Sequence, residues 1–471
     1  MPPSLALVLW FLFLLGLFYF DPAKTSRISA ALWVPLMWMW IMGTRLPSQW
    51  FDIQVGQGTQ ALEEGNPFDR NIFIILILIA IGILGSRSFK WADFCVRNLA
   101  LIAFLCFGLL SVLWSDYPVV ALKRWFRDLG NYLMILVILS DSNPLEAVRT
   151  VLRRLSYLVI PLSVLLIRYY PQISRIYNSW TGTFTDAGPT TGKNLLGVLA
   201  VISGVFFFWD TVTRWSNRKD VRTRRIIVVN IGFIGMTLWL LKIANSTTAN
   251  VCLSLGCLAI WAAYSNVFGR RPRLLKMLAP AAVCLYVILA FGFGMNGDLA
   301  AYVGKDPTLT DRTKIWAVVL GMHTNPLLGT GYESFWMGPR LQWFWQHAGL
   351  GNLNEAHNGF LELYLNLGFI GGALLIGFLI ASYRGICRAL RPGAALASLT
   401  LSLWTIAIFY NMTEAGFRSG LIWLTVLLGG IVIPGRAQAK VLPKSLTSLR
   451  SYRPARMMAH ANYWEGRKLP S

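Results

Sequence analysis

Long apolar runs, each bounded by charged or turn-forming residues, recur along almost the whole of this 471-residue sequence. About 20 apolar residues in one helix cross the hydrocarbon core of a bilayer. Hydrophobic residues make up 55% of the chain, and its mean hydropathy is +0.53. In lipid, only helices and closed barrels satisfy their own backbone hydrogen bonds. Runs of this length predict an all-α, polytopic integral membrane protein.

The runs predict about twelve or thirteen membrane helices, joined into one domain over residues 1–434. The first run has no basic n-region and no A-x-A cleavage site, so it reads as a retained helix and not as a signal peptide. The fifth predicted span, 131–140, is short, so we extend its start back to Leu122. The predicted spans are 4–20, 28–44, 71–85, 99–114, 131–140, 155–168, 194–210, 226–243, 251–266, 277–294, 359–382, 394–411 and 420–434.

Lys and Arg are distributed unevenly among the predicted loops, and this asymmetry predicts the orientation of the chain. Alternate loops and the basic tail 435–471 together hold 29 of the 43 basic residues. We assign these loops and the tail, which we predict to be disordered, to the cytoplasm. The loops assigned to the outside, which we take as the periplasm, are 45–70, 115–131, 168–193, 244–250, 295–358 and 412–419.

The net charge of +22 is explained by this topology, because basic loops lie beside anionic lipid headgroups. No nucleic-acid-binding motif accompanies the charge, so nucleic acid is not a predicted partner. The six cysteines form no CxxC pair and no Cys/His spacing typical of a metal site. We predict no metal and no cofactor.

The outer loop 295–358 is the one long polar interruption of the apolar pattern, and it contains three of the four histidines. His357 lies at the mouth of the next apolar run, where an imidazole can accept a proton from a lipid-anchored substrate. A histidine at a helix start also often only caps a neighbouring loop. His323 and His347 lie deeper in the loop and rank lower as candidates.

Within this loop, Thr310–Met322 is predicted to be a helix, with Asp311 as its cap and an apolar stripe on one face. Arg312 and Lys314 then lie at the helix start, near the membrane interface. The aromatic, glycine-rich segments 328–332 and 336–345 are suited to packing on sugar faces or on lipid.

The basic residues of the outer loops are exceptions to the orientation rule. Each alone is explained equally well by headgroup anchoring. As a set next to helix mouths, they predict a shared electropositive site, because arginine binds phosphate through bidentate bonds. The set is Lys123, Arg124, Arg127, Arg168, Arg175, Lys193, Lys242, Arg312, Lys314 and Arg418.

Two motif lookalikes carry little weight. Residues 188–194, ending in Lys193 and Asn194, are one residue short of a P-loop and lack its Ser/Thr, although Lys193 opens a helix whose N-terminus attracts anions. Residues 292–297 match GxGxxG, but they follow a membrane helix and not a strand.

Several segments, taken in order over about residues 65–430, resemble the O-antigen ligase and polymerase superfamily. This family includes the bacterial O-antigen ligases and the O-antigen and exopolysaccharide polymerases. The segments are Trp114-Ser115-Asp116-Tyr117-Pro118 with Lys123-Arg124, Gly192-Lys193-Asn194, Asp311-Arg312-Thr313-Lys314-Ile315-Trp316, Asn325-Pro326-Leu327-Leu328-Gly329-Thr330-Gly331, and Glu355-Ala356-His357-Asn358 through Leu361-Glu362 to Gly368.

The resemblance implies a metal-independent glycosyltransferase of the bacterial inner membrane, acting on the periplasmic face. Its donor would be a glycan on undecaprenyl pyrophosphate, and its acceptor lipid A–core or another lipid-linked repeat unit. His357 would be the general base, and Arg312 with Arg124 or Arg168 would hold the pyrophosphate. The full set of substrate-binding candidates is Arg124, Arg127, Arg168, Lys193, Lys314 and Asn358.

This chemistry is consistent with the residues themselves, because no ATP is available outside and the energy must lie in the substrate's phosphate linkage. The overall similarity to exopolysaccharide polymerases favours polymerisation over ligation, with other polysaccharide-assembly proteins as possible partners. A lipid-linked glycan transporter or flippase remains an alternative, although the predicted spans hold few ionisable residues, with Lys242 and Asp210 at their ends. Another is a polyprenyl-phosphate sugar transferase using Asp52, Glu63, Glu64 and Asp69. A non-catalytic assembly scaffold is the third.

Overall fold

A computed structural model describes residues 1–22, 28–53, 65–178, 182–265, 272–288, 310–349, 353–391, 393–418 and 420–433. The chain divides into two units, Met1–Val432 and Ile433–Ser471, and every described helix and strand lies in the first. The predicted tail 435–471 and the GxGxxG segment 292–297 lie outside the described residues.

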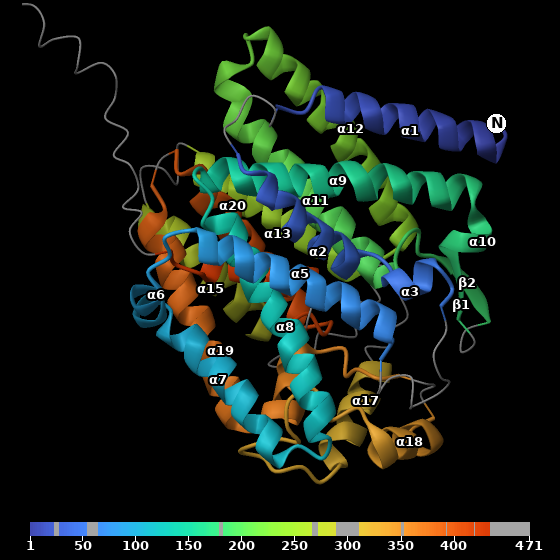
Figure 1. Ribbon diagram of the computed structural model, residues 1–471, viewed down its shortest axis with the longest axis vertical. Helices are drawn as coiled ribbons and strands as arrows, with labels where there is room; N and C mark the ends of the chain where they lie inside the picture. Colours follow the sequence, from blue (N-terminus) through green and yellow to red (C-terminus); the bar gives the residue numbers. More distant parts are fainter. Residues whose placement is uncertain are drawn as a thin grey trace, which may run out of the picture. The chain divides into compact units, whose positions relative to one another are not determined.

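The described part of the first unit is almost entirely α-helical, which confirms the predicted fold class (Figure 1). Its α-helices are α1 (Pro3–Tyr19), α2 (Trp33–Gly43), α3 (Pro47–Trp50), α5 (Pro67–Ser86), α6 (Trp91–Arg97), α7 (Leu99–Leu110), α8 (Pro118–Leu139), α9 (Pro144–Tyr169), α10 (Pro171–Ser174), α11 (Lys193–Arg214), α12 (Val221–Ala244), α13 (Thr247–Tyr264), α15 (Pro272–Val287), α17 (Thr310–Gly321), α18 (Gly338–His347), α19 (Gly359–Ala389), α20 (Ala395–Asn411) and α21 (Leu421–Gly430).

Six of the described helices are long and apolar enough to cross a membrane: α5, α9, α11, α12, α13 and α19. The pair α6 and α7, bent by 93° where they meet, would add a seventh span. Four shorter apolar helices comprise α1, α20, α21 and residues 30–43, where a 3-10 turn leads into α2. Every predicted span falls at least partly on a helix, so the polytopic membrane architecture is confirmed.

Two helices begin earlier than the hydropathy pattern predicts. α8 starts at Pro118, so most of the predicted outer loop 115–131 is helix. α9 starts at Pro144, where the side chain of Asn143 accepts a hydrogen bond from the Glu146 amide. Proline fits the first helical turn because its missing N–H has no partner there anyway. The apolar pattern misses the first turns of α9 because they are polar, whereas α8 begins only one turn before the predicted start at Leu122.

A short β-hairpin interrupts the predicted outer loop 168–193 and was not predicted. β1 (Arg175–Asn178) pairs antiparallel with β2 (Thr183–Asp186). Its first cross-strand pair is an ion pair in which Arg175 Nε lies 3.2 Å from Asp186 Oδ1. The strands are too short for the alternation of polar and apolar residues to show in the sequence.

The few charges near the span ends form a buried cluster, which was not predicted. Asp210 of α11 is fully buried and lies 2.6 Å from Arg153 of α9, 3.0 Å from Arg214 and 3.4 Å from Arg149. The Asn230 amide of α12 donates to the same carboxylate at 3.0 Å. These charges are tolerated because they are paired, and the cluster ties three helices together.

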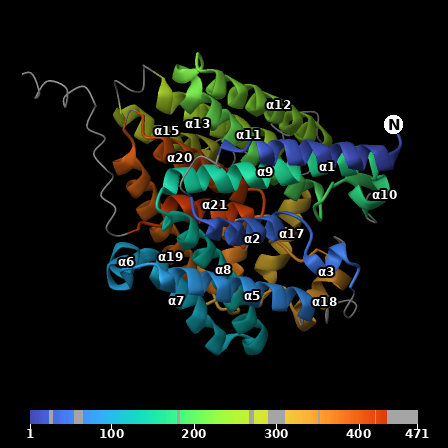
Figure 2. The same cartoon turned by 45° about the horizontal axis from the view of Figure 1, so that its top comes forward.

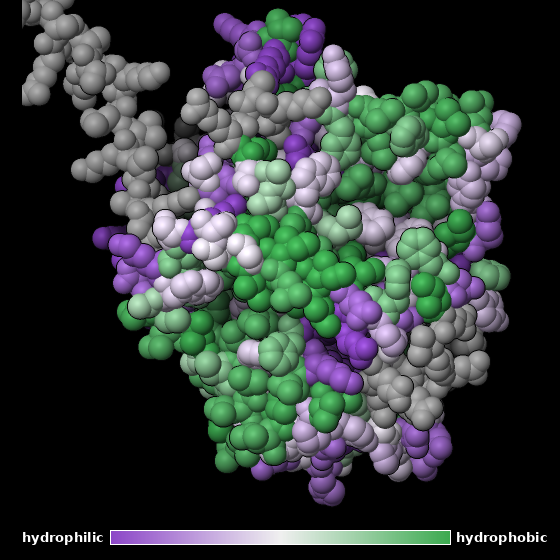
Figure 3. All heavy atoms as spheres, in the orientation of Figure 1, coloured by the Kyte–Doolittle hydropathy of each residue, from purple (hydrophilic) through white to green (hydrophobic). Residues whose placement is uncertain are grey.

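α9 and α11 are the central helices, whereas α5 lies at the periphery. In the apolar segments of α9 and α11, 78% of residues are buried, against 22% in α5. Figure 1 shows α9 and α11 below α1 and α12, and Figure 3 shows hydrophobic side chains spread over α1, α5 and α7 on one face. An apolar outer face on peripheral helices is what contact with lipid requires.

α19 is kinked at Gly368, whose φ of 62° lies in the left-handed region that glycine tolerates. The amides of Phe369 and Ile370, after the kink, donate to the carbonyls of Pro326 and Leu327 at 2.8 and 3.2 Å. The segment before and into α18, residues 325–340, is called the outer segment below. It supplies hydrogen bonds that α19 loses at its kink.

The same segment also contacts α19 before the kink. The amides of Thr330 and Gly331 donate to the carbonyls of Leu365 and Asn366 at 3.1 and 2.9 Å. A Cβ atom on Gly329, where φ is +68°, would lie 2.4 Å from the carbonyl carbon of Asn366. Residues 325–331 thus have a structural role, and their glycines permit close backbone contact.

The outer segment also packs against the start of α8. Ser115 Oγ lies 2.6 Å from Ser334 Oγ, and Arg340 Nη2 lies 2.9 Å from Asp116 Oδ2. Residues 115–116 and residues 334–340, which lie far apart in the sequence, therefore pack against each other.

α17 and α18 lie side by side at one end of the unit (Figures 1 and 2). They bury a small core of Ile315 and Val319 from α17 with Leu341 and Phe344 from α18. The predicted helix in the long loop is thus confirmed. It begins at Thr310, so Asp311 lies inside its first turn and is not the residue before it.

Candidate active site

His357 lies at the end of the segment that leads into α19, and its backbone φ is 49°. Non-glycine residues rarely adopt this conformation, and such strain gathers at functional sites. Its Nδ1 atom lies 3.0 Å from Glu414 Oε2 and 3.1 Å from Glu355 Oε1. One ring edge of the imidazole thus faces two carboxylates.

Glu414 is the centre of this group. It is only 4% exposed and lies in the short connection after α20. Arg312 Nη2 of α17 lies 2.8 Å from Glu414 Oε1, and Asn194 Nδ2 of α11 donates to the same oxygen at 3.0 Å. One carboxylate thus joins side chains from α11, α17 and the segment before α19.

The pKa of the His357 imidazole reflects opposing influences. Burial lowers it, but the hydrogen bond with Glu414 and the charges of Glu355 and Glu414 raise it, and Arg312 lowers it slightly. The net direction is upward from 6.5. A carboxylate on Nδ1 fixes the tautomer whose Nε2 can accept a proton, which is the arrangement of a general base. No described residue forms a hydrogen bond or ion pair with Nε2.

The backbone around His357 is held by three groups from separate parts of the fold. Trp316 Nε1 donates to the Ala356 carbonyl at 2.9 Å, and the Ala356 amide donates to Glu362 Oε1. Arg418 Nη1 donates to the Asn354 carbonyl at 3.0 Å. The imidazole is therefore carried on a fixed segment.

Asn358 caps α19. Its Oδ1 accepts the amides of Phe360 and Leu361 at 3.0 and 3.1 Å, and its Nδ2 donates to the Met412 carbonyl at 3.4 Å. This N-cap accounts for the side chain structurally. Its predicted part in substrate binding stays a prediction.

A second charged group lies next to the first, around Glu333. Glu333 also has a positive φ, 51°, and its carboxylate lies 3.0 Å from Arg418 Nη2. The Arg124 guanidinium donates to the Glu333 carbonyl. Burial raises the pKa of Glu333, but Arg418 and Arg124 outweigh burial and lower it from 4.5 to about 2.

Arg127 is paired with an acid and is not an unpaired cation. Its Nε lies 3.0 Å from Asp128 Oδ1, and Tyr332 OH donates to Asp128 Oδ2 at 2.9 Å. Its positive charge is thus largely offset by the buried carboxylate beside it.

The structure therefore brings only part of the predicted electropositive set together. His357 and Arg312 meet at Glu414, and Arg124 and Arg418 meet at Glu333. Arg168, at the end of α9, Lys193, at the start of α11, and Lys314, on α17, are exposed, and the ion pairs of these two groups do not include them.

Metal coordination at this site is chemically possible. One ligand atom each of Glu355, His357 and Glu414 lie within 4.8 Å of one another. Carboxylate and imidazole ligands suit a divalent cation such as Zn²⁺. The Arg312 guanidinium already neutralises Glu414, however, and a cation there would compete with it. A metal-free site remains our prediction.

All side chains of both groups come from segments that were predicted to share one side of the membrane, or from the helix starts beside them. Comparison with known protein families gives an independent indication of function. Residues 190–376 match the family model described as O-antigen ligase, and this range contains Asn194, Arg312, Glu333 and His357.

This match supports the predicted O-antigen ligase and polymerase family.

A similarity to a bacterial exopolysaccharide protein extends over a longer stretch of the chain. The chain is 24% identical over 362 residues to the exopolysaccharide production protein ExoQ of Rhizobium meliloti (strain 1021). The match covers 73% of this chain and 79% of that protein. The predicted resemblance to this superfamily is thus confirmed.

Sequence reasoning missed Glu414 and Glu333 as site residues. One signal for Glu414 was available, because it is the only Asp or Glu between Glu362 and the tail at Glu465. A lone acid in a short outer connection needs a partner, and His357 and Arg312 provide two. Glu333 had no such signal, since its role depends on the chain folding back onto Arg418.

Proposed function

We propose that this enzyme transfers glycan from undecaprenyl pyrophosphate to an acceptor hydroxyl in exopolysaccharide synthesis, with polymerisation of repeat units favoured over ligation to lipid A–core. It would act in the bacterial inner membrane with its site facing the periplasm. The observation that carries the proposal is the His357–Glu414–Arg312 arrangement. An imidazole base and a guanidinium held by one buried carboxylate fit attack by a hydroxyl on a phosphate-linked sugar.

In the proposed step, the acceptor oxygen forms a bond to the anomeric carbon. The bond between that carbon and the phosphate oxygen breaks, and undecaprenyl pyrophosphate leaves with the electron pair. His357 Nε2 takes the hydroxyl proton, and Glu414 stabilises the imidazolium. General base catalysis of this kind contributes typically about 10²–10⁴-fold. Attack opposite the leaving group inverts the anomeric centre.

Arg312 would stabilise the charge that develops on the leaving pyrophosphate. A guanidinium has five N–H donors, and the contact with Glu414 uses the Nη2 group. A well-placed donor to developing charge is worth about 3–4 kcal/mol. Arg124, Lys193 and Lys314 are the further candidates for the phosphates. Arg168 is retained as a weaker one, and Arg127 ranks below them because Asp128 offsets its charge.

The test is reconstitution of the full chain with an undecaprenyl-pyrophosphate-linked oligosaccharide, read as a glycan ladder. We expect a ladder from wild type and none from His357→Ala, with both proteins folded by thermal melting. His347→Ala is the matched control, because His347 is an exposed histidine of the same loop that stacks on Trp343. A wild-type ladder from His357→Ala would refute the base. Adding lipid A–core separates ligation from polymerisation.

The alternatives receive less support from the described residues. Asp69, a candidate of the carboxylate-dependent transferase, accepts hydrogen bonds from the Ser48 amide and hydroxyl at 2.8 and 2.5 Å, so it has a structural partner. Asp210, the buried acid that a transporter would need, is paired with arginines. Translocation of lipid-linked glycan without bond formation would favour the transporter.

A further inference from the structure

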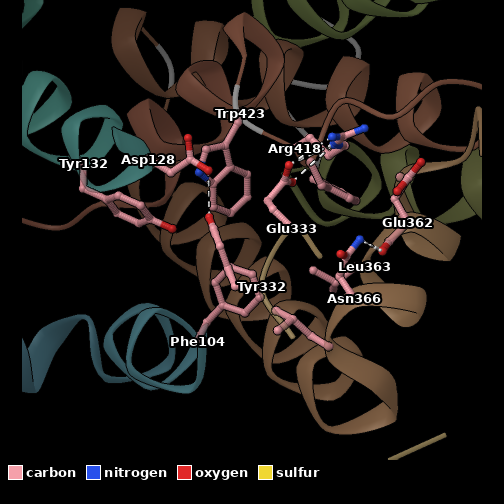
Figure 4. A pocket seen from close by; sticks show the side chains of 13 residues that line it. Phe104, Asp128, Tyr132, Tyr332, Glu333, Glu362, Leu363, Asn366, Arg418 and Trp423 are labelled. Carbon is pink, nitrogen blue, oxygen red and sulfur yellow. Dashed lines mark hydrogen bonds and ion pairs between the residues drawn. The ribbon is translucent and has the colours of Figure 1, made fainter. Parts of the chain in front are cut away.

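Glu362 is a buried acid to which the proposed mechanism gives no task. It lies in the first turn of α19, its exposed fraction is 1%, and it lines the pocket drawn in Figure 4 together with Asn366 and Arg418. A carboxyl group buried this deeply needs hydrogen-bond donors in place of water. Its donors come from two separate segments of the chain.

The first donor is the indole of Trp336, in the outer segment. Its Nε1 atom donates to Oε1 and Oε2 of Glu362 at 2.9 and 3.0 Å. Trp336 is 4% exposed, and the preceding amide, that of Phe335, donates to Asn366 Oδ1 at 3.1 Å. The indole is therefore a fixed group of the interior and does not meet a substrate.

The second donor is the amide of Ala356, the residue before His357. On its other side, the Ala356 carbonyl accepts a hydrogen bond from Trp316 Nε1 of α17 at 2.9 Å. The peptide groups on both sides of Ala356 are thus held by side chains of two different helices.

The chain after His357 is held as well. The Asn358 side chain caps α19, and the Asn358 carbonyl accepts the Glu362 amide at 2.9 Å. His357 therefore lies between two fixed residues, with its φ at 49°. A non-glycine residue keeps such a conformation only where its surroundings impose it.

We infer that Glu362 is a positioning residue, which acts through the Ala356 amide to hold His357 in the left-handed conformation where Nδ1 meets Glu414. Its role in the reaction rests on the proposed function, since that role needs His357 as the base. Glu362 itself does not touch substrate, because it is buried and already accepts two donors. Its loss should let the imidazole turn away from Glu414, and a displacement of about 1 Å at a catalytic group can lower a rate about 100-fold.

Glu362→Gln keeps the shape of the side chain but changes its hydrogen bonding. A glutamine offers one acceptor oxygen, and its NH₂ group is a donor that cannot serve the Ala356 amide or Trp336 Nε1. One of these two donors is then left without an acceptor. We expect kcat for glycan transfer to fall about 10- to 100-fold and KM to change less than about threefold, because no substrate contact is removed.

Trp336→Phe is the matched variant, because it removes the other donor and leaves the Ala356 amide with its carboxylate. We expect its kcat to stay within about threefold of wild type. In the double variant, the glutamine oxygen has only the Ala356 amide to accept, so transfer should be about tenfold faster than in Glu362→Gln alone. A purely structural role predicts the reverse, since the losses of two buried contacts would add.

The imidazole gives a second measurement that needs no turnover. The chain has four histidines, so the ring NMR signals of His357 can be identified by their loss in His357→Ala. Burial lowers the pKa of His357, but Glu414 and Glu355 outweigh burial and raise it above 6.5, with Arg312 opposing them. An imidazole turned away from these carboxylates should titrate at lower pH in Glu362→Gln, and at the wild-type pH again in the double variant.

Two results would overturn the inference. One is a wild-type kcat and a wild-type His357 titration in Glu362→Gln that is folded by thermal melting. The other is a double variant that transfers glycan more slowly than Glu362→Gln. If Glu362→Gln does not fold, Trp316→Phe loosens the same Ala356 peptide from α17 and should lower the His357 pKa, and an unchanged titration there would also overturn the inference.

Failure of the proposed function would look different. A wild-type ladder from His357→Ala would refute the base, whatever Glu362 does. The NMR titration of the Glu362 and Trp336 variants would then decide alone whether Glu362 positions the imidazole.

Discussion

His357 Nδ1 lies 3.0 Å from Oε2 of Glu414, a buried acid 57 residues further along the chain. The contact joins the segment before α19 to the connection after α20. It also gives the imidazole a partner whose charge favours the protonated form. The acid thereby sets both the orientation and the basicity of the proposed base.

Replacing Glu414 with Gln should lower the rate of glycan transfer about 10²-fold or more, because the imidazole loses its orienting charge. It should also lower the pKa of His357, since the hydrogen bond with Glu414 and its charge raise that pKa. A base must be deprotonated, so activity rises with pH through the pKa. That rise should move to lower pH in Glu414→Gln, as measured by pH–rate profiles.

Glu355→Gln is the matched control for this shift. Glu355 contacts the same Nδ1 atom at 3.1 Å but its side chain is 35% exposed. We expect a shift in the same direction with a smaller loss of rate. If the Glu414→Gln profile keeps the wild-type midpoint, Glu414 does not tune the base.

Glu333 should make the fold sensitive to acid. Its pKa is lowered from 4.5 to about 2 by Arg418 and Arg124 against the effect of burial. A carboxyl group whose pKa is lower in the folded state contributes stability above its unfolded pKa and loses it as the pH falls. The melting temperature should therefore fall between pH 4.5 and about 2 more steeply in wild type than in Glu333→Gln.

At neutral pH the same Glu333→Gln variant should be less stable by at most about 3–5 kcal/mol, because it leaves the half-buried Arg418 without its acid. Thermal melting in detergent over the pH series measures both effects. Parallel melting curves for the two proteins across the acid range would count against the ion pair.

Gly368→Ala should destabilise the protein strongly. A Cβ atom there would lie 2.3 Å from the Leu327 carbonyl, at a φ of +62° that side chains rarely adopt. Gly372→Ala is the matched control one turn later, since nothing lies within 4 Å of its Cβ position. We expect low yield and early melting for Gly368→Ala alone. Equal stability of the two variants would show that α19 needs no kink.

Asp210→Asn should destabilise the central helices by about 3–5 kcal/mol, because three arginines lose the charge they surround. Asp93→Asn removes an exposed acid on α6 and is the control for loss of charge. Melting temperatures in detergent compare them. Unchanged stability of Asp210→Asn would mean that the cluster does not fasten α9 to α11.

The helices could be predicted from the sequence because each carries its own apolar run. The polar first turns of α9 were missed, since hydropathy reports burial in lipid and not helical hydrogen bonding. His357 and Arg312 could be found from residue type and position near a helix mouth. Glu333 could not, because its partner Arg418 lies 85 residues away and only the folded chain joins them.

The hydrogen bonds between residues 325–331 and both sides of the Gly368 kink have a mechanical consequence. If residues 325–331 moved away from the imidazole, their backbone hydrogen bonds to the membrane helix α19 would have to break. Substrates must therefore reach His357 without a hinge at this segment, and any change in the tilt of α19 would be transmitted to it directly.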